Sequence, residues 1–303
     1  MFPGQGSQFV GMGRDLRDAF PSVRALYEEA DEILGAPLSR VCFEGPEDEL
    51  VKTVNTQPAI YLHSIAVLRL LEERGHRPEA VAGHSLGEYS ACVAAGAIEH
   101  RDALRLVRRR GELMFQAGLE RPGAMAAVLG LSEGALEEAL AEARAAGTVV
   151  AANLNSPGQV VISGDPPAVE KAMETARARG AKRAMRLPVS GAFHSPLMRP
   201  AAEGLRAALA EVPIRDAAVP VFGNATAAPA RDAARIREAL EAQLVSPVRW
   251  EESVRAMRAA GVMQFLEVGP GKVLRGLVRN IDREVAVESI GDPASLEAFA
   301  AAS

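Results

Sequence analysis

The spacing of apolar positions divides the first part of the chain into helices around one short strand. Apolar residues recur at helical spacing over residues 22–34 and 58–74, and a glycine follows each segment as a stop signal. A short apolar run at residues 80–82 is followed by a glycine-flanked turn and by residues 88–98, which are compatible with a helix. This order predicts a strand, a tight turn and a helix, and a further amphipathic helix is predicted over residues 100–118.

The segment between about residues 123 and 188 has a different hydrophobic pattern, in which short apolar runs alternate with two amphipathic stretches. The predicted strands cover residues 124–131, 148–154, 159–164 and 181–189, and the predicted helices cover residues 132–146 and 166–179. The order βαββαβ is typical of a ferredoxin-like unit, a four-stranded sheet with two helices. We therefore expect an inserted subdomain at residues 123–189, between the two halves of a larger domain at residues 1–122 and 190–303.

The remaining residues return to strands that alternate with helices. Helices are predicted over residues 196–209, 231–244, 248–260 and 271–279, and strands over residues 220–224, 264–269 and 285–290. Such alternation implies a largely parallel sheet that helices cover on both faces. The predicted fold class is α/β, and 303 residues suit one large domain that carries an insertion.

Composition narrows the classes of protein that the chain could represent. Hydrophobic residues make up 48% and charged residues 24%, which excludes disordered, collagen-like and coiled-coil proteins. A net charge of −5 and 4% aromatic residues argue against nucleic-acid binding, and no apolar run approaches the roughly 18 residues of a membrane span. Two cysteines cannot form a disulfide framework, no cluster has metal-ligand spacing, and a cytoplasmic location fits.

The strongest candidate for chemistry is the GxSxG sequence at residues 83–87, with Ser85 at its centre. Glycines on either side permit a sharp turn between a strand and a helix, which lifts a serine hydroxyl clear of the sheet and directs backbone N–H groups at a developing oxyanion. The alternative is an ordinary turn serine. Because the motif lies between a predicted strand and a predicted helix, we favour Ser85 as a nucleophile.

A serine nucleophile needs a base, and the chain has five histidines. His63, His76 and His100 lie within or at the edges of predicted helices, where a structural or solvated role is expected. The side chain of His84 should diverge from that of the adjacent Ser85. His194 lies in a loop just before a helix that Pro196 can begin, so by elimination it is the candidate base.

One arginine stands on the apolar face of its predicted helix. Arg110 follows Val107 by three residues and precedes Met114 by four, so it shares their face. Such an arginine either reaches the solvent or points into a site where it meets a carboxylate or a phosphate. Together with a serine nucleophile, Arg110 suggests an acyl substrate that carries its own carboxylate.

Several separated motifs resemble one family along nearly the whole chain and in the same order. They are FPGQGSQ (2–8), GHSLGEYSA (83–91), RG (110–111), NSPGQVVISG (155–164), GAFHSPLM (191–198), SPVRW (246–250) and EVGPGKVL (267–274). The chain resembles malonyl-CoA:acyl-carrier-protein transacylases and the acyltransferase domains of fatty-acid and polyketide synthases. The resemblance implies an α/β-hydrolase-like core with a ferredoxin-like insertion, and a monomer.

The resemblance also implies an activity, which is transfer of a malonyl group from malonyl-CoA to the phosphopantetheine thiol of acyl carrier protein. The transfer passes through a malonyl-serine, needs no cofactor or metal, and supplies fatty-acid synthesis. The roles implied for single residues are nucleophile for Ser85, general base and acid for His194, backbone oxyanion donors for Gln5 and Leu86, carboxylate binding for Arg110, orientation of the histidine by the backbone carbonyl of Gln243, and cleft lining for Asn155.

Two details of the resemblance concern the start of the chain and the surface that would bind the carrier protein. Family members usually carry an apolar strand before FPGQGSQ, whereas here only Met1 precedes this motif. The expected carrier protein is acidic, so it needs a basic surface beside the cleft. Lys182, Arg183 and Arg186 are candidates, with a solvated strand edge as the alternative.

Other functions remain as alternatives to a malonyl transferase of fatty-acid synthesis. A stand-alone acyltransferase of polyketide synthesis would use the same residues. A serine hydrolase such as an esterase or thioesterase shares GxSxG, but the chain has no HGGG motif, and His194 lies 303 − 194 = 109 residues before the last residue rather than late in the chain. A module that only docks carrier protein would have no use for Ser85, His194 and Arg110 together.

Overall fold

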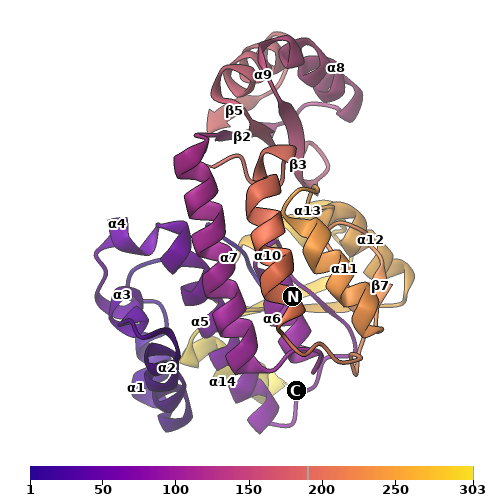
Figure 1. Cartoon of the computed structure of the whole chain (residues 1–303). Coiled ribbons are helices and arrows are strands. Elements are labelled where there is room, and N and C mark those ends of the chain that lie inside the picture. Colours follow the sequence, from indigo (N-terminus) through magenta and orange to yellow (C-terminus); the bar gives the residue numbers. More distant parts are fainter. Residues whose placement is uncertain (190, 303) are drawn as a thin grey trace.

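The chain forms a larger lower part and a smaller upper part in the view of Figure 1. The structure is a computed structural model that describes residues 1–189 and 191–302. The long helices α7 (His100–Glu120) and α10 (Arg199–Ala210) lie side by side in the lower part and extend toward the upper part. None of the helices in the described residues is long and apolar enough to cross a membrane.

The lower part contains two small sheets of short strands, each with one parallel pair. Strand β1 (Val81–Ala82) pairs in parallel with β6 (Val221–Phe222), and β8 (Gln264–Val268) pairs in parallel with β9 (Ala286–Ile290). Strand β7 (Pro229–Ala230) adds to β6 in antiparallel orientation. The predicted α/β alternation therefore produces parallel pairs with helices around them.

The first two residues join these parallel pairs. The amide of Phe2 donates to the carbonyl of Ala82 at 3.0 Å, and the amide of Val268 donates to the carbonyl of Met1 at 2.8 Å. Phe2 also forms a parallel bridge with Gly83. Residues 1 and 2 thus occupy the place of a strand between β8 and β1, and the loop that follows them lies directly beside the turn of the GxSxG motif.

Helices surround this sheet. The remaining helices of the lower part are α1 (Arg14–Ala19), α2 (Pro21–Leu34), α3 (Leu38–Glu44), α4 (Glu47–Leu50), α5 (Thr53–Glu73), α6 (Gly87–Ala94), the 3₁₀ turn η2 (Pro196–Met198), α11 (Ala233–Gln243), α12 (Trp250–Ala259), α13 (Val273–Ile281) and α14 (Pro293–Ala302).

Helix α5 begins earlier than the sequence predicts. The sequence predicts Pro58 at its start, but the helix begins at Thr53 and Pro58 lies inside it. Proline has no N–H to donate to the carbonyl four residues earlier, which here belongs to Val54. The Nη1 atom of Arg108 on α7 donates to that carbonyl at 3.1 Å. A side chain from the neighbouring helix therefore replaces the missing backbone hydrogen bond.

The upper part is a four-stranded antiparallel sheet with two helices, which we call the small sheet unit. Its strands are β2 (Ala124–Leu129), β3 (Val149–Ser156), β4 (Gln159–Gly164) and β5 (Arg183–Arg186), in the spatial order β3-β4-β2-β5. Helices α8 (Glu133–Ala143) and α9 (Pro166–Ala178), with the 3₁₀ turn η1 (Arg144–Ala146), connect them. The predicted sequence of strands and helices is present, with strand bounds shorter than expected at β5.

The two faces of the small sheet have different partners. Alternate residues of β2 point to opposite faces, as the period of a strand requires. Ala126 and Val128 pack in one apolar cluster with residues of α8 and α9, whereas Met125 belongs to the core of the lower part. In Figure 1 the two helices accordingly lie on the side of the sheet away from the lower part.

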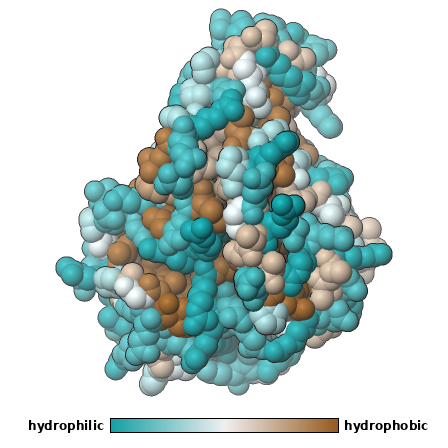
Figure 2. Space-filling model, in the orientation of Figure 1, coloured by the Kyte–Doolittle hydropathy of each residue, from teal (hydrophilic) through white to brown (hydrophobic). Residues whose placement is uncertain are grey.

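Figure 2 shows a surface that is mainly hydrophilic, with apolar residues gathered near the upper end of α7. Phe115 and Leu119, in the last part of that helix, are both exposed. Apolar surface thus lies where α7 approaches the small sheet unit.

Candidate active site

Ser85 lies at the turn between β1 and α6, on a backbone of unusual conformation. Its φ angle is 51°, a left-handed conformation that residues with a side chain rarely adopt. A Cβ atom on Gly83 would lie 1.9 Å from the backbone of Gly87, and one on Gly87 would lie 2.1 Å from the carbonyl oxygen of Phe2. Both glycines are therefore needed for the close approach that forms the turn.

The side chain of Asn224, just after β6, holds this turn from the neighbouring strand. The amide of Ser85 donates to Oδ1 of Asn224 at 2.6 Å, and Nδ2 of Asn224 donates to the carbonyl of Gly83 at 2.6 Å. Asn224 itself is buried, with 1% of its surface exposed. A single side chain thus clamps the backbone on both sides of His84.

Ser85 and His194 are in hydrogen-bond contact although they are 109 residues apart in the chain. The distance from Ser85 Oγ to His194 Nε2 is 2.8 Å. The Nδ1 atom of His194 lies 3.0 Å from the backbone carbonyl oxygen of Gln243. Because that carbonyl can only accept, Nδ1 carries the proton and Nε2 accepts from the serine hydroxyl.

The electrostatics around His194 favour its neutral form. Burial and the positive charge of Arg110 lower the pKa of His194 to about 3, against the opposing effect of the hydrogen bond to Gln243. A neutral imidazole is the form that can accept a proton from Ser85. The geometry and the protonation state would therefore both allow His194 to act as a general base toward Ser85.

Arg110 of α7 points into this site rather than to the solvent. It is 1% exposed. Its Nη2 atom donates to Ser85 Oγ at 3.1 Å and to Oε1 of Gln243 at 2.8 Å, and its Nη1 atom donates to Oε1 of Gln57 at 2.7 Å. No carboxylate of the described residues forms a salt bridge with Arg110, so its guanidinium has neutral partners and can receive an anion.

A cavity of about 90 Å³ opens over these three side chains. Its lining residues come from both parts of the molecule and are Gln5, Gln57, His84, Ser85, Leu86, Arg110, Met114, Met125, Asn153, Leu187, Val189, Phe193 and His194. Among the described residues, the backbone N–H groups of Gln5 and Leu86 have no hydrogen-bond acceptor. Two unused donors thus lie on the wall next to Ser85.

Asn155 contacts the site through a neighbour of the serine. The Oδ1 atom of Asn155 lies 2.8 Å from Nε2 of His84, and the ring of His84 packs against Trp250 with their centroids 5.6 Å apart. The side chain of His84 therefore turns away from that of Ser85, as the sequence predicts. Asn155 is a partner of His84 and does not touch Ser85.

The basic residues predicted beside the cleft lie on or next to β5. Lys182, Arg183 and Arg186 are all exposed, and Arg186 forms a salt bridge with Glu170 at 2.7 Å. The chain continues from β5 to Leu187 and Val189, which line the cavity. This strand edge thus leads to the mouth of the site.

Three polar residues of the site were missed by the sequence analysis. Gln57 holds Arg110, Asn224 holds the turn, and the buried Glu88 accepts from Nε2 of Gln243 at 2.7 Å. Glu88 lies inside the GHSLGEYSA motif, so its position was a signal that was available. Gln57 and Asn224 are single polar residues with no local pattern, and their contacts to the site come from distant parts of the chain.

Comparison with known proteins identifies the family. Residues 1–291 match the acyl transferase domain family. The chain belongs to this family. It is 50% identical over 298 residues to a malonyl CoA-acyl carrier protein transacylase of Bacillus subtilis strain 168, and the match covers 98% of this chain and 94% of the relative. It is 44% identical to the transacylase of the same name from Escherichia coli strain K12, with 98% and 97% covered.

Solved structures agree with these relatives. An acyl carrier protein S-malonyltransferase from Vibrio cholerae has a TM-score of 0.94 and 45% identity, and the match covers 98% of both chains. A malonyl-transacylase in complex with its type II polyketide-synthase acyl-carrier protein has a TM-score of 0.97 and 44% identity, with 100% of this chain and 98% of that chain covered. The resemblance seen in the motifs and the mixed α/β class are confirmed.

Proposed function

We propose that this protein transfers a malonyl group from malonyl-CoA to the phosphopantetheine thiol of acyl carrier protein, through a malonyl-Ser85 intermediate. The observation that carries the proposal is the convergence of two groups on the hydroxyl oxygen of Ser85. Ser85 Oγ lies 2.8 Å from the base His194 and 3.1 Å from the guanidinium of Arg110. A nucleophile, its base and an anion-binding group thus meet in one cavity, as this acyl transfer requires.

In the first half of the reaction, His194 Nε2 takes the hydroxyl proton while Ser85 Oγ attacks the thioester carbonyl. The tetrahedral oxyanion would be stabilised by the free N–H groups of Gln5 and Leu86, and loss of one such donor costs about 3 to 4 kcal/mol in well-studied serine enzymes. The intermediate collapses by breaking the carbon–sulfur bond. His194 returns its proton to the departing thiolate of coenzyme A.

Arg110 gives the site its preference for malonyl over acetyl groups. The free carboxylate of the malonyl group pairs with the planar fork of the guanidinium. Because the charge of Arg110 is one cause of the low pKa of His194, pairing it with an anion also makes His194 a stronger base. An acetyl group would leave Arg110 without an anion and His194 less basic.

In the second half, the carrier-protein thiol gives its proton to His194 and attacks the malonyl-serine carbonyl. The same oxyanion donors serve both halves. These steps use the chain's own groups, the thioester of malonyl-CoA and the thiol of the carrier protein, and we propose that they need no metal or cofactor. Gln243, through its backbone carbonyl, keeps the proton of His194 on Nδ1, so a dyad with a carbonyl takes the place of a triad.

We further propose the division of the chain into a catalytic domain at residues 1–122 and 190–303 and a small subdomain at residues 123–189. The parallel pairs around β1 support a hydrolase-like core, and the strand order β3-β4-β2-β5 supports a ferredoxin-like subdomain. We expect a monomer that acts in the cytoplasm. Asn155 would line the cleft and orient His84.

Fatty-acid and polyketide carrier proteins present the same thiol, and one of the similar structures contains a carrier protein of a type II polyketide synthase. We favour fatty-acid synthesis, which the resemblance of the motifs implies; the relatives from Bacillus subtilis and Escherichia coli are named malonyl CoA-acyl carrier protein transacylases. Transfer rates to carrier proteins of the two kinds would separate the two assignments.

The test of the proposed function is the intact mass of the protein after brief incubation with malonyl-CoA, acetyl-CoA or methylmalonyl-CoA. We expect an adduct of the mass of a malonyl group, and its loss in Ser85→Ala with folding unchanged by circular dichroism. Addition of holo carrier protein should then discharge the adduct to its thiol. A folded protein that gains no adduct from any of the three would refute the transferase and leave a hydrolase or a docking module.

A further inference from the structure

Glu88 is a buried carboxylate that the steps above do not use. It lies in the first turn of α6, three residues after Ser85, and is 1% exposed. Its Oε2 atom accepts from Nε2 of Gln243 at 2.7 Å and from the backbone N–H of Asn224 at 3.2 Å. Both donors belong to residues that also hydrogen-bond to the backbone of Ser85, so Glu88 is connected to the nucleophile through Gln243 and Asn224.

The side-chain amide of Gln243 connects Glu88 to Arg110. Its nitrogen donates to Glu88 and to the carbonyl of Ser85, the latter at 2.9 Å, while its oxygen accepts from Arg110 at 2.8 Å. An amide nitrogen can only donate and an amide oxygen can only accept. The amide therefore has one orientation, in which its negative end faces the cation and its positive end faces the anion.

Few other charges face Glu88. From α7 it faces Arg110, whose charge lowers the pKa of Glu88. On α6 itself the nearby titratable groups are Tyr89 and Cys92, and burial raises the pKa of both, which keeps them neutral. From α11, Arg235 and Glu238 line the same cavity as Glu88.

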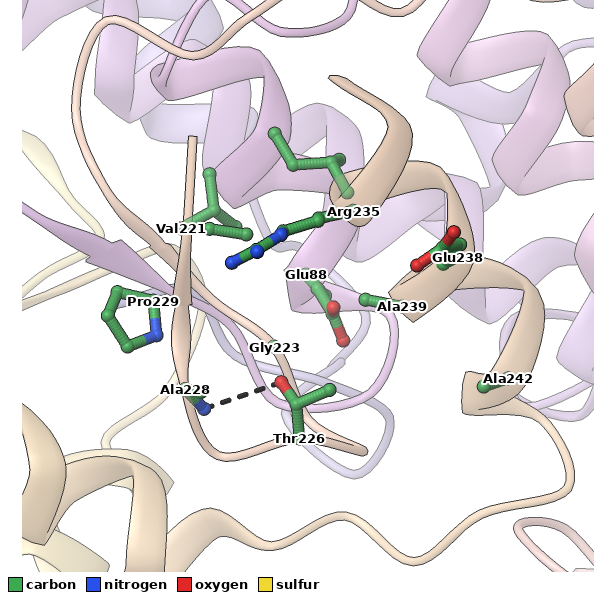
Figure 3. Close-up of a pocket in the computed structure, with 12 residues that line it drawn as sticks. Glu88, Val221, Gly223, Thr226, Ala228, Pro229, Arg235, Glu238, Ala239 and Ala242 are labelled. Carbon is green, nitrogen blue, oxygen red and sulfur yellow. Dashed lines mark hydrogen bonds between the residues drawn. The ribbon is translucent and has the colours of Figure 1, made fainter. Parts of the chain in front are cut away.

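That cavity lies behind the turn of Ser85 and is separate from the one that holds His194. It measures about 410 Å³, and Glu88 is one of its lining residues. Figure 3 shows the carboxylate of Glu88 between the loop of Thr226 and helix α11 at Ala239, with Arg235 and Glu238 extending from the same helix. Water in this cavity can reach Glu88 without passing the acyl group, which gives a proton a route to the carboxylate.

We propose that Glu88 is a positioning residue that balances the charge of Arg110 while the acyl site is empty, and that it takes up a proton from the rear cavity when a malonyl carboxylate pairs with Arg110. The inference rests on the function proposed above. Without this proton, two anions would share one cation although Glu88 and Arg110 are both buried, which is costly. The proton moves from solvent to a carboxylate oxygen of Glu88, and no other bond changes.

The ionisation of Glu88 is suited to this exchange. Burial raises its pKa to about 7, although the hydrogen bonds from Gln243 and Asn224 and the charge of Arg110 oppose the rise. A malonyl carboxylate would cancel the effect of Arg110, so the pKa would rise further when malonyl binds. By linkage, malonyl binding then weakens as pH rises through about 7, and one unit of pKa change corresponds to a tenfold change in affinity.

The first experiment uses the unaltered protein. It is mixed with malonyl-CoA or acetyl-CoA at about pH 7 in weak buffer with a pH indicator, and proton uptake is divided by the amount of acyl-serine found by mass. The acetyl reaction corrects for the thiol that is released. With malonyl-CoA we expect the protein to take up roughly half a proton more per acyl-serine than with acetyl-CoA, because a group at its pKa is half ionised. Equal proton changes with the two substrates would overturn the proposal.

The second experiment compares Glu88→Gln with the matched control Glu238→Gln, which removes a carboxylate from the same cavity. The oxygen of a glutamine at residue 88 can still accept from Gln243 and Asn224, so this variant removes charge and keeps shape. We expect the malonyl-to-acetyl ratio of acylation to fall about tenfold between about pH 6 and pH 9 in the unaltered protein and in the control. In Glu88→Gln the ratio should not change with pH.

The outcomes separate this inference from the proposed function. If no malonyl-serine forms, the transferase itself fails. If malonyl-serine forms with the same pH-dependent ratio in Glu88→Gln as in the unaltered protein, only the role of Glu88 fails. Should Glu88→Gln not fold, the proton measurement on the unaltered protein still decides.

Discussion

The small sheet unit and the region around Ser85 bury opposite kinds of side chain. The core of the small sheet unit consists of apolar residues such as Val128, Leu140 and Ile162, and no charged residue or histidine among its described residues is buried. Around Ser85, by contrast, Glu88, Arg110 and His194 are all nearly inaccessible to solvent. One region gains stability from burial, while the other uses burial to change the ionisation of its groups.

The two regions therefore contribute differently to the stability of the folded state. An apolar core lowers the free energy of the folded state in proportion to the area buried. Buried ionisable groups are costly unless they have partners, and here the partners are amides and carbonyls of Gln57, Asn224 and Gln243 rather than opposite charges in direct contact. Substitutions in the two regions should therefore change different measured quantities.

The largest effect on stability is expected from the apolar core of the small sheet unit. Ile162→Ala should lower the free energy of unfolding by about 2 to 5 kcal/mol, because it leaves a cavity at a fully buried residue of β4. Urea unfolding measures this loss. Val150→Ala, at a partly exposed site on the adjacent β3, is the matched control and should cost less. A change in the malonyl-to-acetyl ratio of folded Ile162→Ala would contradict the separation of the two regions.

The next effect is on specificity. Arg110→Ala should lower the rate of malonyl-serine formation by about 10- to 100-fold, because the malonyl carboxylate would be buried without a partner. Acetyl-serine formation should be kept or increased. Arg110→Lys, which keeps the charge but not the planar fork, should lie between the two. An unchanged malonyl preference in Arg110→Ala would remove this residue from the carboxylate site.

Glu88 provides a stability test with a defined pH dependence. Its folded pKa of about 7 is above the ordinary value of 4.5, so the stability that its protonated form contributes is present below about pH 4.5 and is lost as pH rises through about 7. Glu88→Gln should therefore be more stable than the unaltered protein at pH 8, by on the order of 1 to 3 kcal/mol, and not at low pH. Urea unfolding at several pH values measures this. A difference that does not vary with pH would show that Glu88 is not an ionising group of the folded state.

A smaller effect is expected at the strand edge beside the cleft. Charge reversal of Lys182 and Arg183 should slow transfer to an acidic carrier protein severalfold and leave acylation by malonyl-CoA unchanged, because only the carrier protein would contact this edge. Lys171→Glu on α9, which lies away from the cleft side of the sheet, is the control. Equal slowing of both half-reactions would place the carrier elsewhere.

The smallest expected effect is that of pH on the rate of acetyl-serine formation. Because the pKa of His194 is about 3, the neutral base persists well below pH 6.5. The rate of acetyl-serine formation should thus change less than about twofold between about pH 7.5 and pH 5, whereas an ordinary histidine would lose about thirtyfold. A fall in rate centred near pH 6.5 would mean that His194 is more exposed to water during the reaction than in the empty site.

Local patterns in the sequence predicted most of the elements and indicated Ser85, His194 and Arg110, which the structure brings together. Ser85 was apparent because a turn between strand and helix needs glycines at fixed spacing, and Arg110 because a charged residue interrupted an apolar face. The start of α5 was misplaced because the hydrogen bond that allows Pro58 inside the helix comes from Arg108 on another helix. The pattern of residues around Pro58 cannot predict a partner that lies on another helix.

The supporting residues of the site could not be predicted for the same reason. Asn224 contacts Ser85 across 139 residues of chain, and Gln243 contacts Glu88 across 155. Each is a single polar side chain whose role arises only when strands and helices from distant segments pack together. Sequence patterns indicate the groups to which we assign the chemistry, whereas folding determines which amides hold them.

The shared core beneath the small sheet has a consequence for motion. Met125, Ala152 and Val161 belong to the same apolar cluster as the helices of the lower part, so swinging the sheet away would expose that cluster to water. We therefore expect the sheet to keep its place, and a thioester to enter by rearrangement of side chains at the cavity wall such as Met125 and Phe193. Amides of β2 and β4 should exchange with deuterium as slowly as those of α5.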